Sequence, residues 1–141
     1  DTNGTNPDML QKLFAENLLD YVAMDLKGPL ELYPKIVDWP VAEQKKLTAQ
    51  IQQSIALILA SGISYEFRTT VVPEYHSEEN LKNMSGLIRG AKKYYLQQFK
   101  KNVSLLDPQF QTVSSYSDQQ LRELAVHCGA YVQEVKVRGV A

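Results

Sequence analysis

Cysteine is nearly missing from this sequence, because Cys128 is the single one among 141 residues. One cysteine excludes an internal disulfide and any metal site built on Cys-x-x-Cys pairs within the chain. Cys128 lies on the apolar stripe of a predicted helix, so we expect a small core residue there rather than a ligand. The scarcity of cysteine fits a reducing compartment, and we expect a cytoplasmic protein.

A charge excess and a long apolar run are missing as well. The formal net charge is −1 with 22% charged residues, whereas nucleic-acid-binding surfaces normally show a basic excess. No apolar run approaches the roughly 18 residues of a membrane-spanning helix. We therefore expect neither a nucleic-acid partner nor a membrane partner.

Helical and strand patterns, in contrast, alternate four times along the chain. Stretches rich in β-branched and aromatic residues predict strands over residues 20–26, 64–72, 93–98 and 130–138. A helical pattern precedes each strand, beginning near Pro7, near Val41, after Ser77 and after Ser117. Residues 27–40, with three prolines, predict a long connection.

Local signals mark the ends of these helices. Asn6 and Pro7 have the residue types of an N-cap and a first helical position, and Ser117 with Gln120 resembles a capping box. Gly62 supplies the stop for a helix over residues 41–61. The first helix is expected to carry an apolar stripe of Leu10, Leu13, Phe14 and Leu18.

The alternation predicts an α/β fold in which parallel strands are joined by crossover helices. Four strands are half of an eight-stranded barrel, a fold that typically takes about 250 residues. We therefore expect residues 1–141 to be the C-terminal portion of a single larger domain, a partial TIM barrel whose N-terminal part is absent from this chain.

Polar residues stand at the carboxyl ends of the predicted strands, where barrels carry their function. Side chains alternate along a strand, so Asp25 and Lys27 share one face, and Arg68 lies near the end of the next strand. Gln97 and Gln98 interrupt the third strand. A carboxylate beside cations suits a zwitterionic or ribose-bearing ligand, because it accepts from ammonium and hydroxyl groups while Lys and Arg bind a carboxylate.

Other interpretations of the same residues stay open. Asp25 paired with Lys27 or Arg68 is also what an internal salt bridge at the barrel end requires. Lys27, at a strand end, is a candidate Schiff-base nucleophile of an aldolase-like enzyme. His76 and His127 lie far apart in the sequence, so we predict structural roles for them and no metal site.

Four words of the sequence, DTNGTNPDML, DYVAMDLKGPLE, YEFRTTVVPEYH and KKYYLQQF, carry a resemblance in their order and spacing. Together they resemble the C-terminal half of radical S-adenosylmethionine (SAM) activating enzymes. The resemblance is greatest to the activating proteins of anaerobic ribonucleoside-triphosphate reductase, and the pyruvate formate-lyase activating enzyme is a more distant relative. It covers most of residues 1–100 and, more loosely, the later LLDP and the terminal VRG.

The resemblance implies a cofactor site at the first two strand ends. The DLK word of the relatives contacts SAM, which implies that Asp25, Leu26 and Lys27 belong to the cofactor site. The arginine of the RxxVVP word corresponds to Arg68, which implies a partner for the SAM carboxylate or for the substrate peptide.

Further cofactor contacts are implied outside these two strands. Asp1 and Asn3 belong to a strand-end loop that faces the same pocket in the relatives. A SAM-contacting histidine of the pyruvate formate-lyase activating enzyme corresponds to a position near Lys100, and Gln97 and Gln98 are candidates from the same strand.

The resemblance also implies a reaction. In the relatives a 4Fe–4S cluster reduces SAM, and the resulting 5′-deoxyadenosyl radical abstracts hydrogen from a glycine of a glycyl radical enzyme. For this protein it implies the anaerobic reductase as target and flavodoxin or ferredoxin as electron donor. The cluster-binding CxxxCxxC word and the GGE word of the family are not in this chain. We therefore expect the cluster in the full-length protein and an inactive isolated chain; the alternative is a non-catalytic half-barrel interaction module that binds a partner enzyme or a nucleotide.

Overall fold

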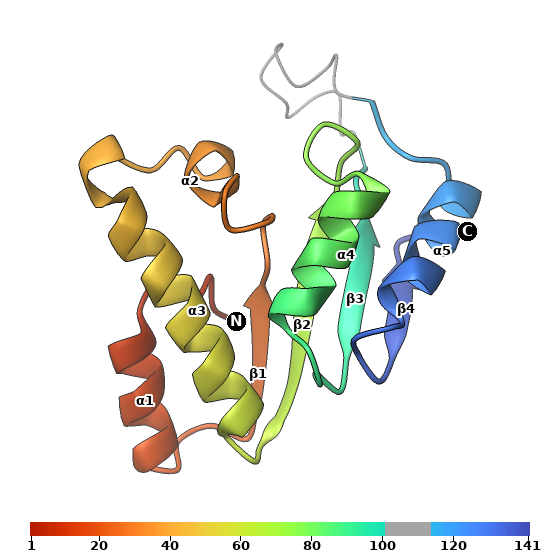
Figure 1. The fold of residues 1–141 in the computed structure, drawn as a ribbon. Coiled ribbons are helices and arrows are strands. Elements are labelled where there is room, and N and C mark those ends of the chain that lie inside the picture. The colour runs from red at the N-terminus through yellow and green to blue at the C-terminus, as the bar shows by residue number, and fades with distance from the viewer. Residues whose placement is uncertain (101–113) are drawn as a thin grey trace.

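Four parallel strands form one sheet, and their order in the sheet is their order in the sequence (Figure 1). The structure, a computed structural model, describes residues 1–100 and 114–141, so the LLDP word at residues 105–108 lies outside the described residues. The predicted α/β class with parallel strands is confirmed. The strands are β1 (Tyr21–Asp25), β2 (Ser64–Val71), β3 (Tyr94–Gln98) and β4 (Val135–Arg138).

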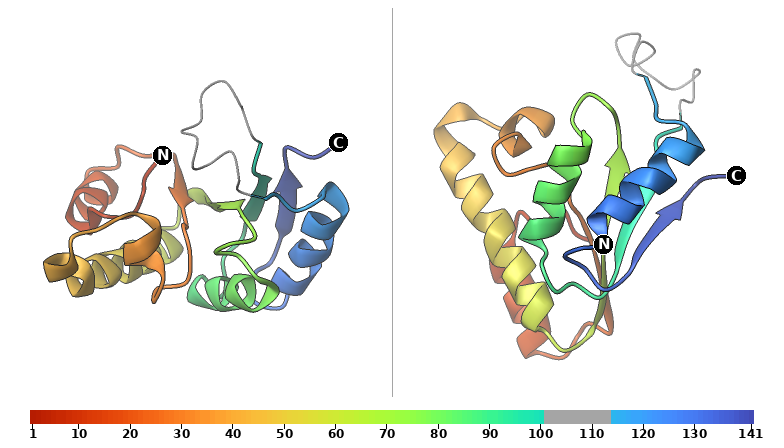
Figure 2. Two further views of the ribbon diagram at one scale, coloured as in Figure 1. Left: turned by 90° about the horizontal axis from the view of Figure 1, so that it is seen from above. Right: turned by 45° about the vertical axis from the view of Figure 1, so that its right-hand side comes forward.

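Three helices connect successive strands and lie on the same side of the sheet (Figure 2). They are α3 (Gln44–Ala60), α4 (Glu78–Leu87) and α5 (Asp118–Cys128). Helix α1 (Pro7–Ala15) precedes β1, and the short α2 (Tyr33–Ile36) and η1 (Val41–Glu43) precede α3. None of the helices in the described part of the chain has the length and apolar character needed to cross a bilayer.

The predicted helix starts are confirmed by their capping bonds. The side chain of Asn6 accepts from the backbone N–H of Met9 at the start of α1. Ser77 caps α4 by accepting from the N–H of Asn80. Ser117 and Gln120 form a complete capping box at the start of α5, so the N–H groups that the helix leaves unpaired are satisfied locally.

The structure corrects three predicted boundaries. The fourth strand begins at Val135 rather than at residue 130, because the carbonyl of Tyr131 is bonded to the N–H of Gly90 in a turn that precedes the ladder. Helix α1 ends at Ala15, and Asn17 takes a left-handed φ of 54°, so Leu18 leaves the apolar stripe and is 62% exposed. The long connection contains α2, where Pro34 stands in the first turn.

A single apolar layer lies between the sheet and the helices. Alternate strand residues enter it, among them Met24 and Phe67, which are fully buried. Cys128 on α5 is also fully buried, as expected of a core residue. The helices contribute Leu47, Ile51, Ile55 and Ile58 from α3, Leu81 and Met84 from α4, and Leu121 and Ala125 from α5.

The segment before α1 is joined to the outer side of β1. The N–H of Thr2 donates to the carbonyl of Ala23, and the N–H of Asp25 donates to the carbonyl of Thr2. Gly4 turns the chain with a φ of +75°, and its carbonyl accepts from the buried hydroxyl of Ser54 on α3 at 2.7 Å. These bonds fix the DTNG word beside the carboxyl end of β1.

Candidate functional site

Charged side chains from β1, β2 and the DTNG segment meet at the carboxyl ends of the first two strands. Asp25 Oδ1 lies 2.9 Å from Nε of Arg68, its register partner on β2. Asp25 Oδ2 lies 3.5 Å from Nζ of Lys27. Asp1 approaches the same arginine, with Oδ2 3.1 Å from Nη2. Two carboxylates and two cations thus form one cluster.

The members of this cluster differ in burial. The side chain of Arg68 is 18% exposed, whereas that of Lys27 is 44% exposed. Exposed ion pairs stabilise a fold by only about 0.2–1 kcal/mol each. The Lys27–Asp25 pair therefore contributes little to folding, and the partly exposed groups of the cluster remain accessible to a ligand.

The backbone that carries Asp25 and Leu26 is fully hydrogen-bonded. Besides the bond from Asp25 N–H to Thr2, the carbonyl of Asp25 accepts from the hydroxyl of Tyr33 at 3.3 Å. The N–H of Leu26 donates to the carbonyl of Arg68, and the carbonyl of Leu26 accepts from Thr69 Oγ1, both at 2.7 Å. Each of these four backbone groups has a partner.

The backbone of Lys27 is held equally firmly. Its N–H donates to the hydroxyl oxygen of Tyr33 at 3.0 Å, and its carbonyl lies 2.8 Å from Nε2 of His76. Buried backbone groups cost free energy when they lack a partner, so such complete pairing favours one conformation of this turn. The turn therefore presents the Asp25 and Lys27 side chains from a fixed base.

The two side chains that bind the Lys27 backbone keep defined protonation states. Burial raises the pKa of Tyr33 to about 12, so its hydroxyl retains the proton that it donates to Asp25. Burial lowers the pKa of His76 from its ordinary value of 6.5, so the neutral ring is favoured. Nδ1 of His76 accepts from the N–H of Val72 at 2.9 Å, which leaves the ring proton on Nε2 to donate to Lys27.

A cavity of about 600 Å³ opens beside the charged cluster. That volume falls within the roughly 300–1,000 Å³ of ordinary ligand pockets. The sequence-predicted residues that line it are Asp25, Leu26, Lys27, Arg68 and Gln97. The other lining residues are Thr70 of β2, Ile36 of α2 and, from the loops that follow β2 and β3, Val72, Tyr75, His76 and Phe99.

Three other predicted site residues lie elsewhere. The side chain of Gln98 points to the helix-covered side, where it donates to the carbonyl of Tyr116 and to Asp118. Asn3 forms a local turn by accepting from the backbone N–H of Thr5 at 3.0 Å. Lys100 lies beside Gly139, after the end of β4. The alternation of strand residues explains why Gln97 and Gln98 separate, since neighbours point to opposite faces.

Of the residues that support the turn, only His76 was singled out from the sequence, as a structural residue without a named partner. Tyr33 follows Asp25 by 8 residues, whereas Thr69 and His76 bind the turn across separations of 43 and 49 residues. The hydroxyl of Thr69 is used for Leu26, so its oxygen accepts from the Tyr94 hydroxyl at 2.7 Å. No sequence pattern marks such distant partners, although the polar Thr69 between Phe67 and Val71 on one face of the strand is a weak signal.

A second polar group that the sequence did not indicate occupies the same sheet face, nearer the amino ends of the strands. Glu66, which is buried, lies 2.8 Å from Nη1 of Arg138 and accepts from the hydroxyl of Tyr21 at 2.6 Å. The guanidinium of Arg138 stands 3.5 Å from the ring centre of Tyr95. Burial and the bond to Glu66 raise the pKa of Tyr21 to about 12. This group pairs its own charges and ties β4 to β2.

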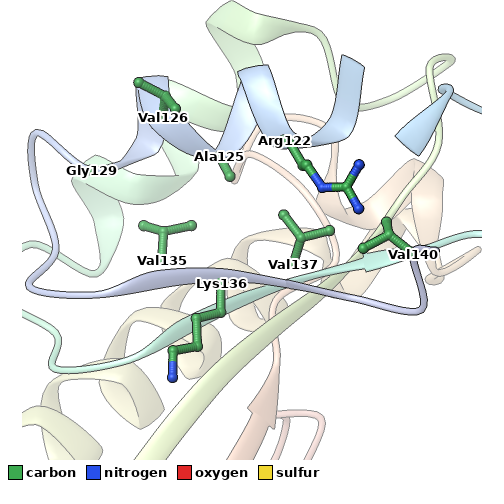
Figure 3. Close-up of a pocket in the computed structure, with 8 residues that line it drawn as sticks. All are labelled: Arg122, Ala125, Val126, Gly129, Val135, Lys136, Val137 and Val140. Carbon is green, nitrogen blue, oxygen red and sulfur yellow. The ribbon is translucent and has the colours of Figure 1, made fainter. Parts of the chain in front are cut away.

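A hollow of about 530 Å³ lies between α5 and β4 (Figure 3). Val135 and Val137 point into it, whereas Lys136 points to the other side of the strand. The lining is mostly aliphatic, and its ionisable side chains are Arg122 and Lys136. It lacks the mixture of acid and base that the cluster at Asp25 offers, so the cavity beside Asp25 is the stronger candidate site.

The resemblance implies two cofactors, SAM and an iron–sulfur cluster, and the residues of this chain suit the first. Asp25, Lys27 and Arg68 provide a carboxylate and two cations beside a cavity, which suits the ammonium and carboxylate of SAM. The thiol of Cys128, the chain's single cysteine, is fully buried. Among the described residues no group of three His, Cys, Asp or Glu side chains is placed to hold a metal. The residues present therefore do not fit an iron–sulfur cluster.

The fold places the chain in a structural class. A crystal structure of a domain of pyruvate-formate lyase-activating enzyme from Bacteroides vulgatus superposes with a TM-score of 0.61. The match covers 91% of this chain and 73% of that one, at 13% sequence identity. At that identity the likeness shows the fold alone, and it confirms the expected partial barrel.

Sequence similarity points to one curated protein. The Methanocaldococcus jannaschii protein named "Putative glycyl-radical enzyme activating enzyme" is 29% identical over 140 residues. The alignment includes 99% of this chain and 58% of that protein, so this chain spans little more than half of its relative's length. No protein-family model matches the chain.

Proposed function

We propose that this chain is part of a radical SAM enzyme that activates a glycyl radical enzyme, and that it supplies part of the SAM site. The observation that carries the proposal is a charged cluster beside a cavity of about 600 Å³. Asp25 and Lys27 lie on the fixed turn at the end of β1, and Arg68 of β2 lies next to them. The similarity to the M. jannaschii protein over 99% of the chain supports it.

Each charged group has a defined task in this proposal. The carboxylate of Asp25 binds the ammonium of SAM or its ribose hydroxyls. The Arg68 guanidinium binds a carboxylate with two parallel N–H groups, and the Lys27 ammonium adds a point charge. Bound SAM would supply, on reduction, the means to abstract hydrogen from a glycine of the partner enzyme. The residues of this chain do not fit a 4Fe–4S cluster, so such a cluster would be held elsewhere in the full-length protein and would supply the electrons.

The partners follow from the same proposal. The target is a glycyl radical enzyme, and the order of the four words favours anaerobic ribonucleoside-triphosphate reductase. Flavodoxin or ferredoxin is the proposed electron donor, and the cytoplasm is the proposed location. In a pull-down under anaerobic conditions, we expect the full-length protein to retain the reductase and not pyruvate formate-lyase.

The decisive experiment replaces Lys27 in the full-length protein. A CxxxCxxC word should be encoded upstream of Asp1, and the purified protein should cleave SAM under reduction. We expect Lys27→Ala to abolish cleavage while the cluster absorbance stays unchanged, because Lys27 contacts the cofactor and not the metal. Lys45→Ala, on the exposed side of α3, is the matched control. Normal cleavage by Lys27→Ala would show that the cofactor site is elsewhere.

The Schiff-base alternative is not favoured by the geometry. A nucleophilic lysine is activated by an apolar pocket or by a neighbouring cation, whereas Nζ of Lys27 lies 3.5 Å from a carboxylate. Borohydride trapping of a carbonyl substrate on Lys27 would reverse that conclusion. A non-catalytic interaction module stays the alternative if the cluster-binding word is missing upstream.

A further inference from the structure

We infer that His76 is a positioning residue that fixes the carbonyl of Lys27 and, through it, the direction of the Lys27 ammonium. This inference deepens the proposed function and rests on it for the identity of the ligand. His76 is 2% exposed and lines the cavity, but the charged cluster does not include it. It acts on the site through the backbone.

His76 is itself immobilised, because both of its ring nitrogens and both of its backbone groups form hydrogen bonds. Its N–H donates to the carbonyl of Val72 at 2.9 Å, and its carbonyl accepts from the hydroxyl of Tyr116 at 2.9 Å. Nδ1 accepts from the N–H of Val72, and Nε2 donates to Lys27. A residue held at four points, two of them on its ring, is a rigid support.

His76 also joins two loops at the rim of the cavity. Val72 and His76 belong to the loop between β2 and α4, and Lys27 begins the loop between β1 and α2. Tyr33 holds the other backbone group of Lys27 from α2. Lys27 is thus held on its N–H by Tyr33 of α2 and on its carbonyl by His76 of the β2–α4 loop, which limits where its ammonium can reach. Catalytic and binding groups depend on such support to keep their geometry.

Two isosteric substitutions separate the two ring contacts. In His76→Gln the side-chain amide reaches the place of Nε2 and can donate to Lys27, but it loses the contact with Val72. In His76→Asn the shorter amide takes the place of Nδ1 and accepts from Val72, but it cannot reach Lys27. Both variants are uncharged and lose one of the two bonds, so a general loss of stability should affect them alike.

The readouts follow the two contacts separately. By NMR of the labelled chain, we expect the Lys27 carbonyl signal to move upfield in His76→Asn and to stay in place in His76→Gln. Exchange of the Val72 amide proton should quicken in His76→Gln only. In the full-length protein, equilibrium dialysis should show roughly tenfold weaker SAM binding for His76→Asn, the loss expected of one hydrogen bond. His76→Gln should bind SAM as the wild type does.

The outcomes distinguish this inference from the proposed function. Equal SAM affinities of the two variants, or an unmoved Lys27 signal in His76→Asn, would overturn the positioning role. If the wild-type full-length protein itself does not bind SAM, the proposed function is wrong, and the Lys27 signal still decides the role of His76. If His76→Asn does not fold, the imidazole ¹⁵N spectrum of the wild type decides, because a proton on Nδ1 instead of Nε2 would contradict the inference.

Discussion

Asp25 and Lys27 are exposed enough to meet a ligand, while the backbone beneath them is held by buried hydroxyls. Thr69 is 1% exposed and serves both Leu26 and the hydroxyl of Tyr94. Thr69→Val keeps the shape of the side chain but removes the hydroxyl, so the hydrogen bonds to Leu26 and Tyr94 are both lost. We expect a loss of about 1–3 kcal/mol in the free energy of unfolding, measured in urea, because two buried polar groups are left unpaired. Thr70→Val, on the exposed neighbour, is the control and should cost much less.

His76 makes the stability of the chain depend on pH. Its pKa in the folded state is lowered by burial from 6.5, whereas the unfolded chain has the ordinary value. Above pH 6.5 neither state binds the proton; below it the unfolded state binds more protons than the folded state, so the free energy of unfolding falls as the pH falls. Urea titrations between about pH 5 and pH 7 should show this slope in the wild type and lose it in His76→Gln.

Other ionisable groups do not obscure this measurement. Asp25, Lys27, Arg68 and Tyr75 line the same cavity, and each is retained in the variant. The lowered pKa of Glu78, paired with Lys82, acts below its ordinary value of 4.5, outside the chosen window. His127→Gln, at the other histidine of the chain, is the matched control. A slope that survives in His76→Gln would contradict the assignment.

At this scale the sequence predicted the charged residues and a structural role for His76, but not the contacts that make Thr69 and His76 supports. Asp25, Lys27 and Arg68 were found because alternation along a strand and the position of a strand end are local properties. Thr69 and His76 have residue types that occur equally in cores and loops, and their partners lie across the fold. Only the three-dimensional arrangement identifies them.

At the scale of elements, two turns with the same backbone conformation differ in what surrounds them. Gly4 and Gly62 have φ values of +75° and +74°. A Cβ on Gly62 would meet no atom within 4 Å, whereas one on Gly4 would collide with the side chain of Met24. Gly62→Ala should cost about 1–2 kcal/mol for the left-handed conformation, and Gly4→Ala should cost about 1–3 kcal/mol more for overpacking. Equal decreases in melting temperature in the two variants would show that the DTNG turn accommodates the added Cβ without strain.

The elements also differ in how far local sequence defines them. The starts of α1, α4 and α5 were predicted because an N-cap bonds to residues only two or three positions away. The predicted start of β4 was wrong, since a strand begins where its neighbour offers a ladder, and the paired residues of β3 lie 41 positions earlier in the sequence. Helix α2 was missed because it has only four residues, one of them Pro34, and so few residues carry too little periodic signal.

At the scale of the whole molecule, β1 is an edge strand of the described sheet, and Thr2 pairs with only its last residues. Large hydrophobic residues on α1, before β1 and at its start are partly exposed: Met9 is 50% exposed, Leu18 62% and Tyr21 44%. Uncharged edges favour pairing with another chain. We expect self-association at high concentration in sedimentation equilibrium, weakened by replacing both Met9 and Leu18 with Lys. A chain that stays monomeric at millimolar concentration would contradict this.

The whole chain also sets a limit on redox chemistry. A cubane cluster that leaves one iron open to SAM needs three thiolates, and this sequence has one cysteine, which is fully buried on α5. Anaerobic reconstitution of the chain with iron and sulfide should give no stable cluster absorbance and no reductive cleavage of SAM. SAM binding should fall to the millimolar range, because two charge-assisted bonds at about 1.5–3 kcal/mol each are worth roughly a hundredfold or more. The full-length protein, treated identically, is the control, and under the proposed function it should form the cluster. If the chain alone formed a cluster, Cys128 would have to leave the core. That result would contradict the proposal that the cluster is held outside this chain.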